Sequence, residues 1–296
     1  MKATIYYRGS LTSCNYDCPY CPFSKNIDSL AILAKDREQI TTFVEWVREQ
    51  GAAGHRLSVF FNPYGEGLTH RWYREAMQEL SHMAHIDKVA IQTNLSAKLD
   101  WTSELDPNRT AFWVTYHPGQ TEEVKFLAQC QELYRRGIPF SVGSVGLKSS
   151  FERLKSLRQA LPSDVYMWVN AFKDKKDYYS ADDLALLMEI DPNFTVNLQD
   201  YDSMGKECHA GYDVFYVQGE GRVKRCYKDR QVIGHLYRDG LEGLSQKREC
   251  RMKCCDCYIG YIHIPELELD DVYGDRLLER IAINPDMIIH TGKQRV

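Results

Sequence analysis

Short apolar runs alternate with longer amphipathic segments from the start of this chain to about residue 190. The apolar runs are rich in β-branched and aromatic residues and are four to eight residues long, as buried strands are. Segments that alternate in this way indicate successive strand-helix units and a mainly parallel sheet. The six predicted strands cover residues 3–8, 57–62, 88–93, 111–116, 139–145 and 165–172.

The intervening segments carry apolar residues at helical spacing. The clearest predicted helix places Ile40, Phe43 and Val47 on one face, with Asp36 as its N-cap and Gly51 at its end. Further helices are predicted over residues 71–83, 121–136, 149–161 and 180–190, and a weaker one over 96–106. Six such units can wind as an open doubly wound sheet or as an incomplete barrel, and periodicity alone does not choose between them.

The alternation stops after about Asn193. Residues 212–218 and 222–227 then read as two strands around the turn Gly219-Glu220-Gly221. The sequence therefore predicts an α/β protein with two domains, over residues 1–192 and 193–296, the second one small and built around a β-hairpin.

Composition and charge are those of an ordinary globular protein. Among 296 residues, 44% are hydrophobic and 26% are charged, which excludes fibrous and wholly disordered proteins. The formal net charge of −4 comes with no basic block, so we expect no nucleic-acid partner. Neither a signal segment nor an apolar run long enough for a membrane span is found, so we expect a soluble, cytoplasmic protein with no membrane partner.

Ten cysteines change this picture. The cytosol keeps thiols reduced, so metal binding explains them better than disulfides do. Three of them, Cys14, Cys18 and Cys21, lie in a proline-containing loop directly after the first predicted strand. Structural zinc takes four ligands, whereas three thiolates in eight residues leave a coordination position open. A [4Fe-4S] cluster with one open iron fits better.

The CxxxCxxC spacing, with the aromatic Tyr20 before the last cysteine, resembles the signature of the radical S-adenosylmethionine (SAM) superfamily. The resemblance implies a partial (β/α)6 barrel of the TIM type. It also implies that Cys14, Cys18 and Cys21 hold a [4Fe-4S] cluster whose fourth iron binds SAM. Reductive cleavage of SAM would then yield a 5′-deoxyadenosyl radical.

The resemblance extends to the ends of other predicted strands. Gly65 and Glu66 resemble the GGE element that contacts SAM in this superfamily, although Tyr64 replaces its first glycine. By position, we expect Asn94 and Ser144 to bind the ribose or carboxylate of SAM, and Asn170 to bind its adenine end. His117 is a candidate general base or a structural hydrogen-bonding residue.

The other cysteines gather late in the chain, except Cys130, whose helical neighbours predict a buried apolar thiol. A hairpin joining Cys208 and Cys226, completed by Cys254 and Cys257, would supply four ligands for zinc or for an iron-sulfur cluster, with Cys250 and Cys255 left over. The spacing from Gly221 to Cys226 resembles the twitch and SPASM extensions of radical SAM enzymes, and the lack of cysteines after Cys257 favours the twitch form with one auxiliary [4Fe-4S] cluster.

We therefore expect a radical SAM enzyme of the oxidoreductase or maturase type. Its substrate would be a small metabolite, or a peptide delivered by a separate recognition partner. The auxiliary cluster would accept an electron or anchor the substrate, and an external reductant such as flavodoxin or ferredoxin would reduce the first cluster. The alternative from another class is an iron-sulfur electron carrier or a zinc-stabilised binding module.

Overall fold

The structure of the chain, a computed structural model, describes residues 1–23 and 26–283 and contains a nine-stranded sheet with the order β10-β9-β8-β1-β2-β3-β4-β5-β6. Six consecutive strands are parallel to their neighbours. This arrangement confirms the predicted α/β fold of the partial TIM-barrel type. The six are β1 (Lys2–Arg8), β2 (Arg56–Phe61), β3 (Ile86–Thr93), β4 (Thr110–Thr115), β5 (Phe140–Val145) and β6 (Met167–Asn170).

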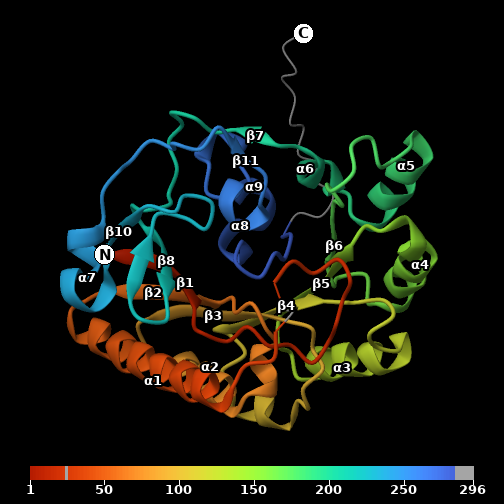
Figure 1. Ribbon diagram of the computed structural model, residues 1–296. Helices are drawn as coiled ribbons and strands as arrows, with labels where there is room; N and C mark the ends of the chain where they lie inside the picture. The colour runs from red at the N-terminus through yellow and green to blue at the C-terminus, as the bar shows by residue number, and fades with distance from the viewer. Residues whose placement is uncertain (24–25, 284–296) are drawn as a thin grey trace.

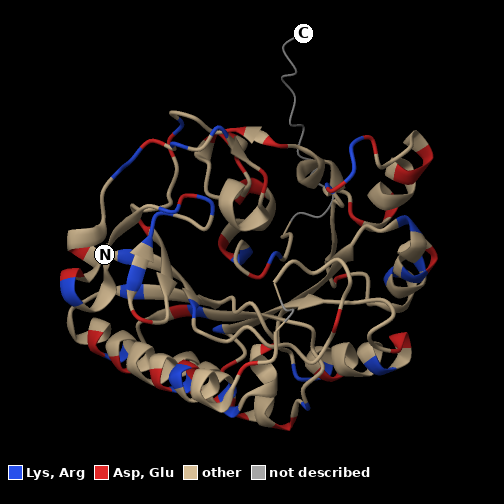
Figure 2. Ribbon diagram, viewed as in Figure 1, with Lys and Arg blue, Asp and Glu red and all other residues tan. Residues whose placement is uncertain are grey.

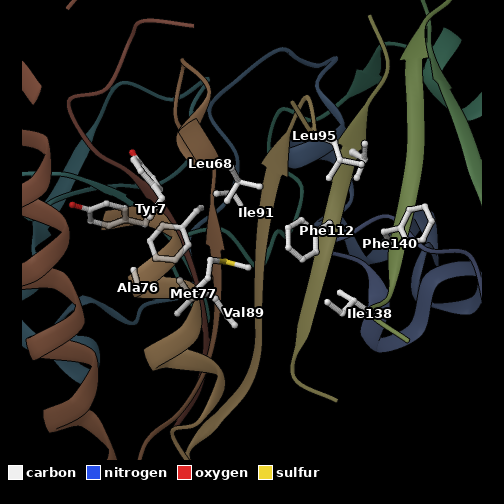
Figure 3. Close-up of a cluster of buried hydrophobic side chains, with 14 of the residues drawn as sticks. Tyr7, Leu68, Ala76, Met77, Val89, Ile91, Leu95, Phe112, Ile138 and Phe140 are labelled. Carbon is white, nitrogen blue, oxygen red and sulfur yellow. The ribbon is translucent and has the colours of Figure 1, made fainter. Parts of the chain in front are cut away.

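Helices connect these strands and cover the outer side of the sheet (Figure 1). They are α1 (Leu30–Ala52), α2 (Arg71–Ser81), α3 (Glu123–Arg135), α4 (Phe151–Ala160) and α5 (Ala181–Ile190), and the sequence predicted all five. Outward-facing strand residues such as Val89, Ile91 and Phe112 pack with helix residues such as Met77 (Figure 3). Because strand side chains alternate between the two faces, this core uses only every second strand residue.

Two details of the helix prediction are wrong. Helix α1 begins at Leu30 with Ser29 as its N-cap, and Asp36 lies inside it, fully buried. The Asp36 carboxylate accepts hydrogen bonds from the backbone N–H of Leu11 (2.9 Å) and from Nε1 of Trp72 (2.8 Å), so it ties α1 to the loop after β1. The weaker predicted helix over 96–106 is a short 3-10 turn, Asp100–Glu104.

The predicted hairpin is present and continues the same sheet. Strands β8 (Val214–Gln218) and β9 (Arg222–Lys224) are antiparallel, and β10 (Val232–His235) follows β9. Strand β8 pairs with β1 in parallel, with Thr4 opposite Val214. The sheet therefore crosses the predicted domain boundary at residue 192, and that boundary stays a prediction.

The C-terminal part of the described chain fills the inside of the curled sheet. Helices α8 (Tyr258–Tyr261) and α9 (Asp270–Tyr273) lie on the concave side, opposite α1 to α3 (Figure 1). They pack against inward-facing strand residues, including Tyr6, Phe60 and Trp168. The remaining strands and α-helices of the described chain are α6 (Phe194–Leu198), β7 (Tyr201–Asp202), α7 (Leu236–Leu244) and β11 (Cys254–Cys255), with β7 and β11 forming a separate antiparallel pair.

Charges of both signs are interspersed along the outer helix α1 (Figure 2). Within the described residues, none of the helices combines the length and the apolar character that crossing a bilayer requires.

Candidate active site

A cavity of about 280 Å³ lies where the parallel strands end. Its wall includes Arg8, Asn62, Gln92, Thr115 and Asn170, from or next to five different strands. The residue two positions before each of them is buried on the concave side of the sheet. Side chains two positions apart in a strand point to the same face, so these five residues also point inward. The side chains at the C-terminal ends of barrel strands are those that carry chemistry in TIM-type folds.

The loop after β1 brings Cys14, Cys18 and Cys21 to the wall of this cavity. Its start is fixed by the buried carboxylate of Asp28, which accepts hydrogen bonds from Thr12 N (2.7 Å) and Ser13 N (2.8 Å). The backbone N–H of Cys21 donates to the carbonyl of Cys18 (3.0 Å), so the loop turns tightly between the two thiols. The three predicted first-cluster cysteines are therefore brought together in the structure.

Gly65 is the point where the loop after β2 contacts the cysteine loop. A Cβ atom at this position would lie 1.8 Å from the carbonyl oxygen of Ser13. Beside it, the N–H of Glu66 donates to the same carbonyl (3.2 Å). Only glycine permits this approach, so Gly65 fixes the cysteine loop against the end of β2.

The Glu66 carboxylate lies at the cavity wall and is only 3% exposed. One oxygen accepts from Thr93 Oγ1 (2.7 Å) and from the N–H of Leu68 (3.1 Å), and the other accepts from the N–H of Asn94 (2.6 Å). Burial raises the pKa of Glu66 from its ordinary value, while these hydrogen bonds act in the opposite direction. A buried carboxylate with this support is a suitable partner for a ligand ammonium group.

Tyr20 and His117 contact each other at the cysteine loop. The Tyr20 hydroxyl lies 2.8 Å from His117 Nδ1, and Cys18 Sγ lies 3.3 Å from the same nitrogen. Burial lowers the pKa of His117 to about 4, so its ring is neutral at neutral pH. With Nδ1 engaged in this way, His117 is placed to hold Tyr20 and Cys18 in position.

The other predicted SAM-binding residues differ in where they lie. Asn94 lines the cavity and donates through Nδ2 to Asn15 Oδ1 (3.0 Å), with Cys14 Sγ 3.7 Å away. Asn170 also lines it, and its Oδ1 accepts from the buried Arg280 (2.7 Å). Ser144 is fully buried and donates to the carbonyl of Tyr116 (2.9 Å), so the structure does not bring it to the cavity.

The donor set fits an iron-sulfur cubane better than a single ion. Among the described residues on this wall, the three cysteines are the only thiols. Their sulfur atoms do not lie close enough together to hold one ion, whereas in the described part of the chain the ligand atoms of Asp200, Cys254 and Asp256 do. A cubane carries its irons at separate corners, so its protein ligands lie farther apart than those of one ion.

A second group of thiols forms outside the barrel strands, from Cys208, Cys226, Cys250 and Cys255. Burial, together with the neighbouring thiols of this group and Cys257, raises the pKa of Cys255 well above its ordinary value. Burial likewise raises the pKa of Cys208 to about 11, with Cys226 and Cys250 contributing. The N–H of Cys250 donates to the carbonyl of Lys206 (2.9 Å), which brings that segment beside Cys208.

Cys254 and Cys257, the other two thiols of the predicted auxiliary set, have different surroundings from this second group. Cys254 and Cys255 are adjacent in β11, so they face opposite sides, and Cys254 lies with Asp200 and Asp256. Cys257 lies next to Cys255, with the cations Lys228 and Arg8 also close to it. Cys130 is 1% exposed within α3, as its helical neighbours predicted.

Sequence reasoning missed several residues that build the site. Arg8 and Asn62 end predicted strands, and each follows an apolar strand residue by two positions, which was the available signal. The roles of Asp28 and Asp36 had no signal, because they depend on how α1 packs against the loop after β1.

Comparisons with known proteins identify a shared fold. No family model matches the chain, and no curated protein matches it. Among solved structures, anSMEcpe with bound AdoMet (SAM) and a Cp18Cys peptide aligns with a TM-score of 0.54 at 14% identity, covering 82% of this chain and 80% of that one. Another structure of anSMEcpe with bound AdoMet aligns with a TM-score of 0.55 at 14% identity, covering 81% and 76%. At this identity the likeness shows that the fold is the same.

Proposed function

We propose that this chain is a radical SAM enzyme in which Cys14, Cys18 and Cys21 bind a [4Fe-4S] cluster. The observation that carries the proposal is the cavity at the strand ends, where three thiols of one loop share a wall with the buried carboxylate of Glu66. A cubane held by three thiolates keeps one iron available for SAM. The likeness in fold to structures with bound AdoMet supports this proposal.

When bound, such a cluster supplies the electron that cleaves SAM into methionine and a hydrogen-abstracting 5′-deoxyadenosyl radical. The residues of the chain bind and orient SAM. Glu66 would hold the ammonium of SAM, and Asn94 donates beside Cys14. Asn170 has its Oδ1 occupied by Arg280, so its amide N–H groups are the donors left for SAM. Tyr20 and His117 position the cysteine loop.

The proposal includes an auxiliary [4Fe-4S] cluster of the twitch type at the second thiol group. We assign its ligands to Cys208, Cys226, Cys250 and Cys255, because these four thiols are mutual neighbours. The auxiliary cluster would accept an electron from the substrate or anchor it. The substrate is a small metabolite or a peptide brought by a partner, and flavodoxin or ferredoxin is the type of reductant required.

The test is SAM cleavage by anaerobically reconstituted protein with dithionite. We expect 5′-deoxyadenosine and methionine in equal amounts, and no cleavage by the Cys14→Ala/Cys18→Ala/Cys21→Ala variant. Cys130→Ala is the matched control and should retain cleavage, since its thiol is buried in α3. Cleavage by the triple variant would exclude the proposal. Iron-sulfur absorption without any cleavage would favour an electron carrier, and bound zinc without iron would favour a binding module.

A further inference from the structure

Arg8, the last residue of β1, is held flat between two aromatic rings at the cavity wall. Its guanidinium carbon lies 4.1 Å from the ring centre of Tyr64 and 3.7 Å from that of Tyr227. Its Nε donates to the carbonyl of Asn62 (2.8 Å), and its Nη2 donates to Asn62 Oδ1. Two aromatic rings therefore pack on the guanidinium, and its N–H groups, which lie in its own plane, are where a ligand can bind.

Arg8 also fixes the direction of the side-chain amides next to it. Arginine can only donate hydrogen bonds, so the oxygen of the Asn62 amide must face Arg8. Nδ2 of Asn62 then donates to Oε1 of Gln92. This leaves Nε2 of Gln92 with two N–H groups and no hydrogen-bond partner among the described residues. The chain Arg8–Asn62–Gln92 thus ends in a donor at the cavity wall.

Arg8 itself keeps unused donors. A guanidinium has five N–H groups, and two of these are engaged by Asn62. The three that remain include one from each of Nη1 and Nη2, which point the same way and match the two oxygens of a carboxylate. With Gln92, this part of the wall offers a ligand a cation and several hydrogen-bond donors.

We propose that Arg8 and Gln92 bind a carboxylate of the substrate, so that the substrate of the proposed radical SAM activity is a carboxylic acid. That the bound acid is the substrate rests on the proposed function. The anion site itself is defined by the residues of the chain alone. The planar fork matches the two oxygens of a carboxylate, and because it can also match a phosphate, phosphate is one arm of the test. Tyr227, one of the two rings on Arg8, directly follows Cys226 of the second thiol group in the chain.

Tyr64 gains an explanation from this site. It occupies the position at which the GGE pattern has a glycine, and its ring covers one face of Arg8. A glycine there would leave that face open to water, which weakens a charge-assisted hydrogen bond.

The carboxylate could also come from SAM itself, and the experiment separates the two sources. Binding is measured anaerobically by calorimetry, with a panel of amino acids, hydroxy acids and dicarboxylic acids, each beside its primary amide, and with inorganic phosphate. SAM binding is measured in parallel. The informative variant is Gln92→Glu, which keeps the oxygen that Asn62 requires and replaces the presented N–H groups by a negative charge.

We expect wild type to bind acids at least tenfold more tightly than their amides, and Gln92→Glu to lose that preference while its affinity for SAM stays within threefold. Arg8→Gln should act in the same way, and Arg8→Lys should keep part of the preference because it keeps the charge without the planar fork. The controls are the exposed Gln246→Glu and Arg56→Gln, at the opposite end of β2, which should match wild type.

Three outcomes would overturn the inference. They are equal binding of acids and amides by wild type, tighter binding of phosphate than of any acid, and a loss of SAM affinity in Gln92→Glu as large as its loss of acid affinity. The last would assign the carboxylate to SAM. Because acid binding is measured without turnover, failure of SAM cleavage would remove the proposed function and leave the anion site intact.

Discussion

Gly65 provides a residue-scale test of how the cysteine loop is held. In Gly65→Ala the new Cβ would overlap the Ser13 carbonyl, a backbone atom that cannot rotate away. We expect the loop to shift, the iron content to fall from about eight toward four per chain, and SAM cleavage to be lost, following four irons per cubane. Iron analysis and electron paramagnetic resonance measure this.

The matched control is Gly243→Ala in α7. The nearest neighbour of a Cβ there is the Cβ of Asp239, at 3.8 Å, so the substitution should leave iron content and cleavage unchanged. Full iron loading and SAM cleavage in Gly65→Ala would mean that the loop position does not depend on this contact.

At this scale, the sequence predicted the residues whose chemistry lies in their own spacing. Cys14, Cys18 and Cys21 are defined by eight consecutive residues, so no tertiary information was needed to group them. Arg8 and Asn62 were not assigned roles, because their contact joins residues 54 positions apart. Ser144 was expected at the site from its place at a strand end, but its hydroxyl is used by Tyr116.

At the scale of elements, β11 provides the second prediction. Its two residues face opposite sides, so Cys255 joins the second thiol group and Cys254 does not. We expect Cys250→Ser and Cys255→Ser to lower iron from about eight toward four per chain, with SAM cleavage retained, following four irons per cubane. Cys254→Ser should keep about eight and is the matched control.

The opposite pattern would restore the ligand set predicted from the sequence, in which Cys254 and Cys257 complete the site. If Cys254→Ser and Cys257→Ser lose the second cluster and Cys250→Ser and Cys255→Ser keep it, the ligand set proposed from β11 is wrong. The sequence interpretation took Cys254 and Cys257 to complete the site begun by Cys208 and Cys226, with Cys250 and Cys255 left over. The strand period of two was not visible in a run of only two residues.

At the scale of the whole molecule, His263 joins the C-terminal segment to the first strand. Its Nε2 lies 2.9 Å from the Tyr6 hydroxyl, and burial, with a smaller effect of His209, lowers the pKa of His263 from 6.5 to about 3. The folded chain keeps this ring neutral, whereas the unfolded chain protonates it below pH 6.5. Its contribution to stability is therefore complete above pH 6.5 and is lost as the pH falls toward 3.

We expect the free energy of unfolding to decrease from pH 7.5 to pH 5.5 more steeply in wild type than in His263→Gln. The difference in slope should approach one proton, about 1.4 kcal/mol per pH unit at the acidic end. Denaturant titration at several pH values measures it, with the exposed His82→Gln as control. Parallel slopes in wild type and His263→Gln would show that His263 protonates equally in both states.

The sequence predicted those parts of the architecture that depend on neighbouring residues, and it did not predict contacts between distant segments. Each strand-helix unit could be located from its own periodicity, and the order β1 to β6 follows from connecting them in sequence. The pairing of β8 with β1 joins Val214 to Thr4, and no local pattern indicates such a partner. The filling of the barrel interior by α8 and α9 is equally non-local.

That filling has a consequence for how the chain is made. Ribosomes deliver the N-terminal strands first, and domains fold as units while synthesis proceeds. Tyr6, Phe60, Trp113 and Trp168 therefore face an unfilled interior until the segment around α8 and α9 has emerged. During that interval the nascent chain exposes a concave aromatic surface of the type that chaperones bind, so its yield in cells should depend on chaperone supply more than its final stability suggests.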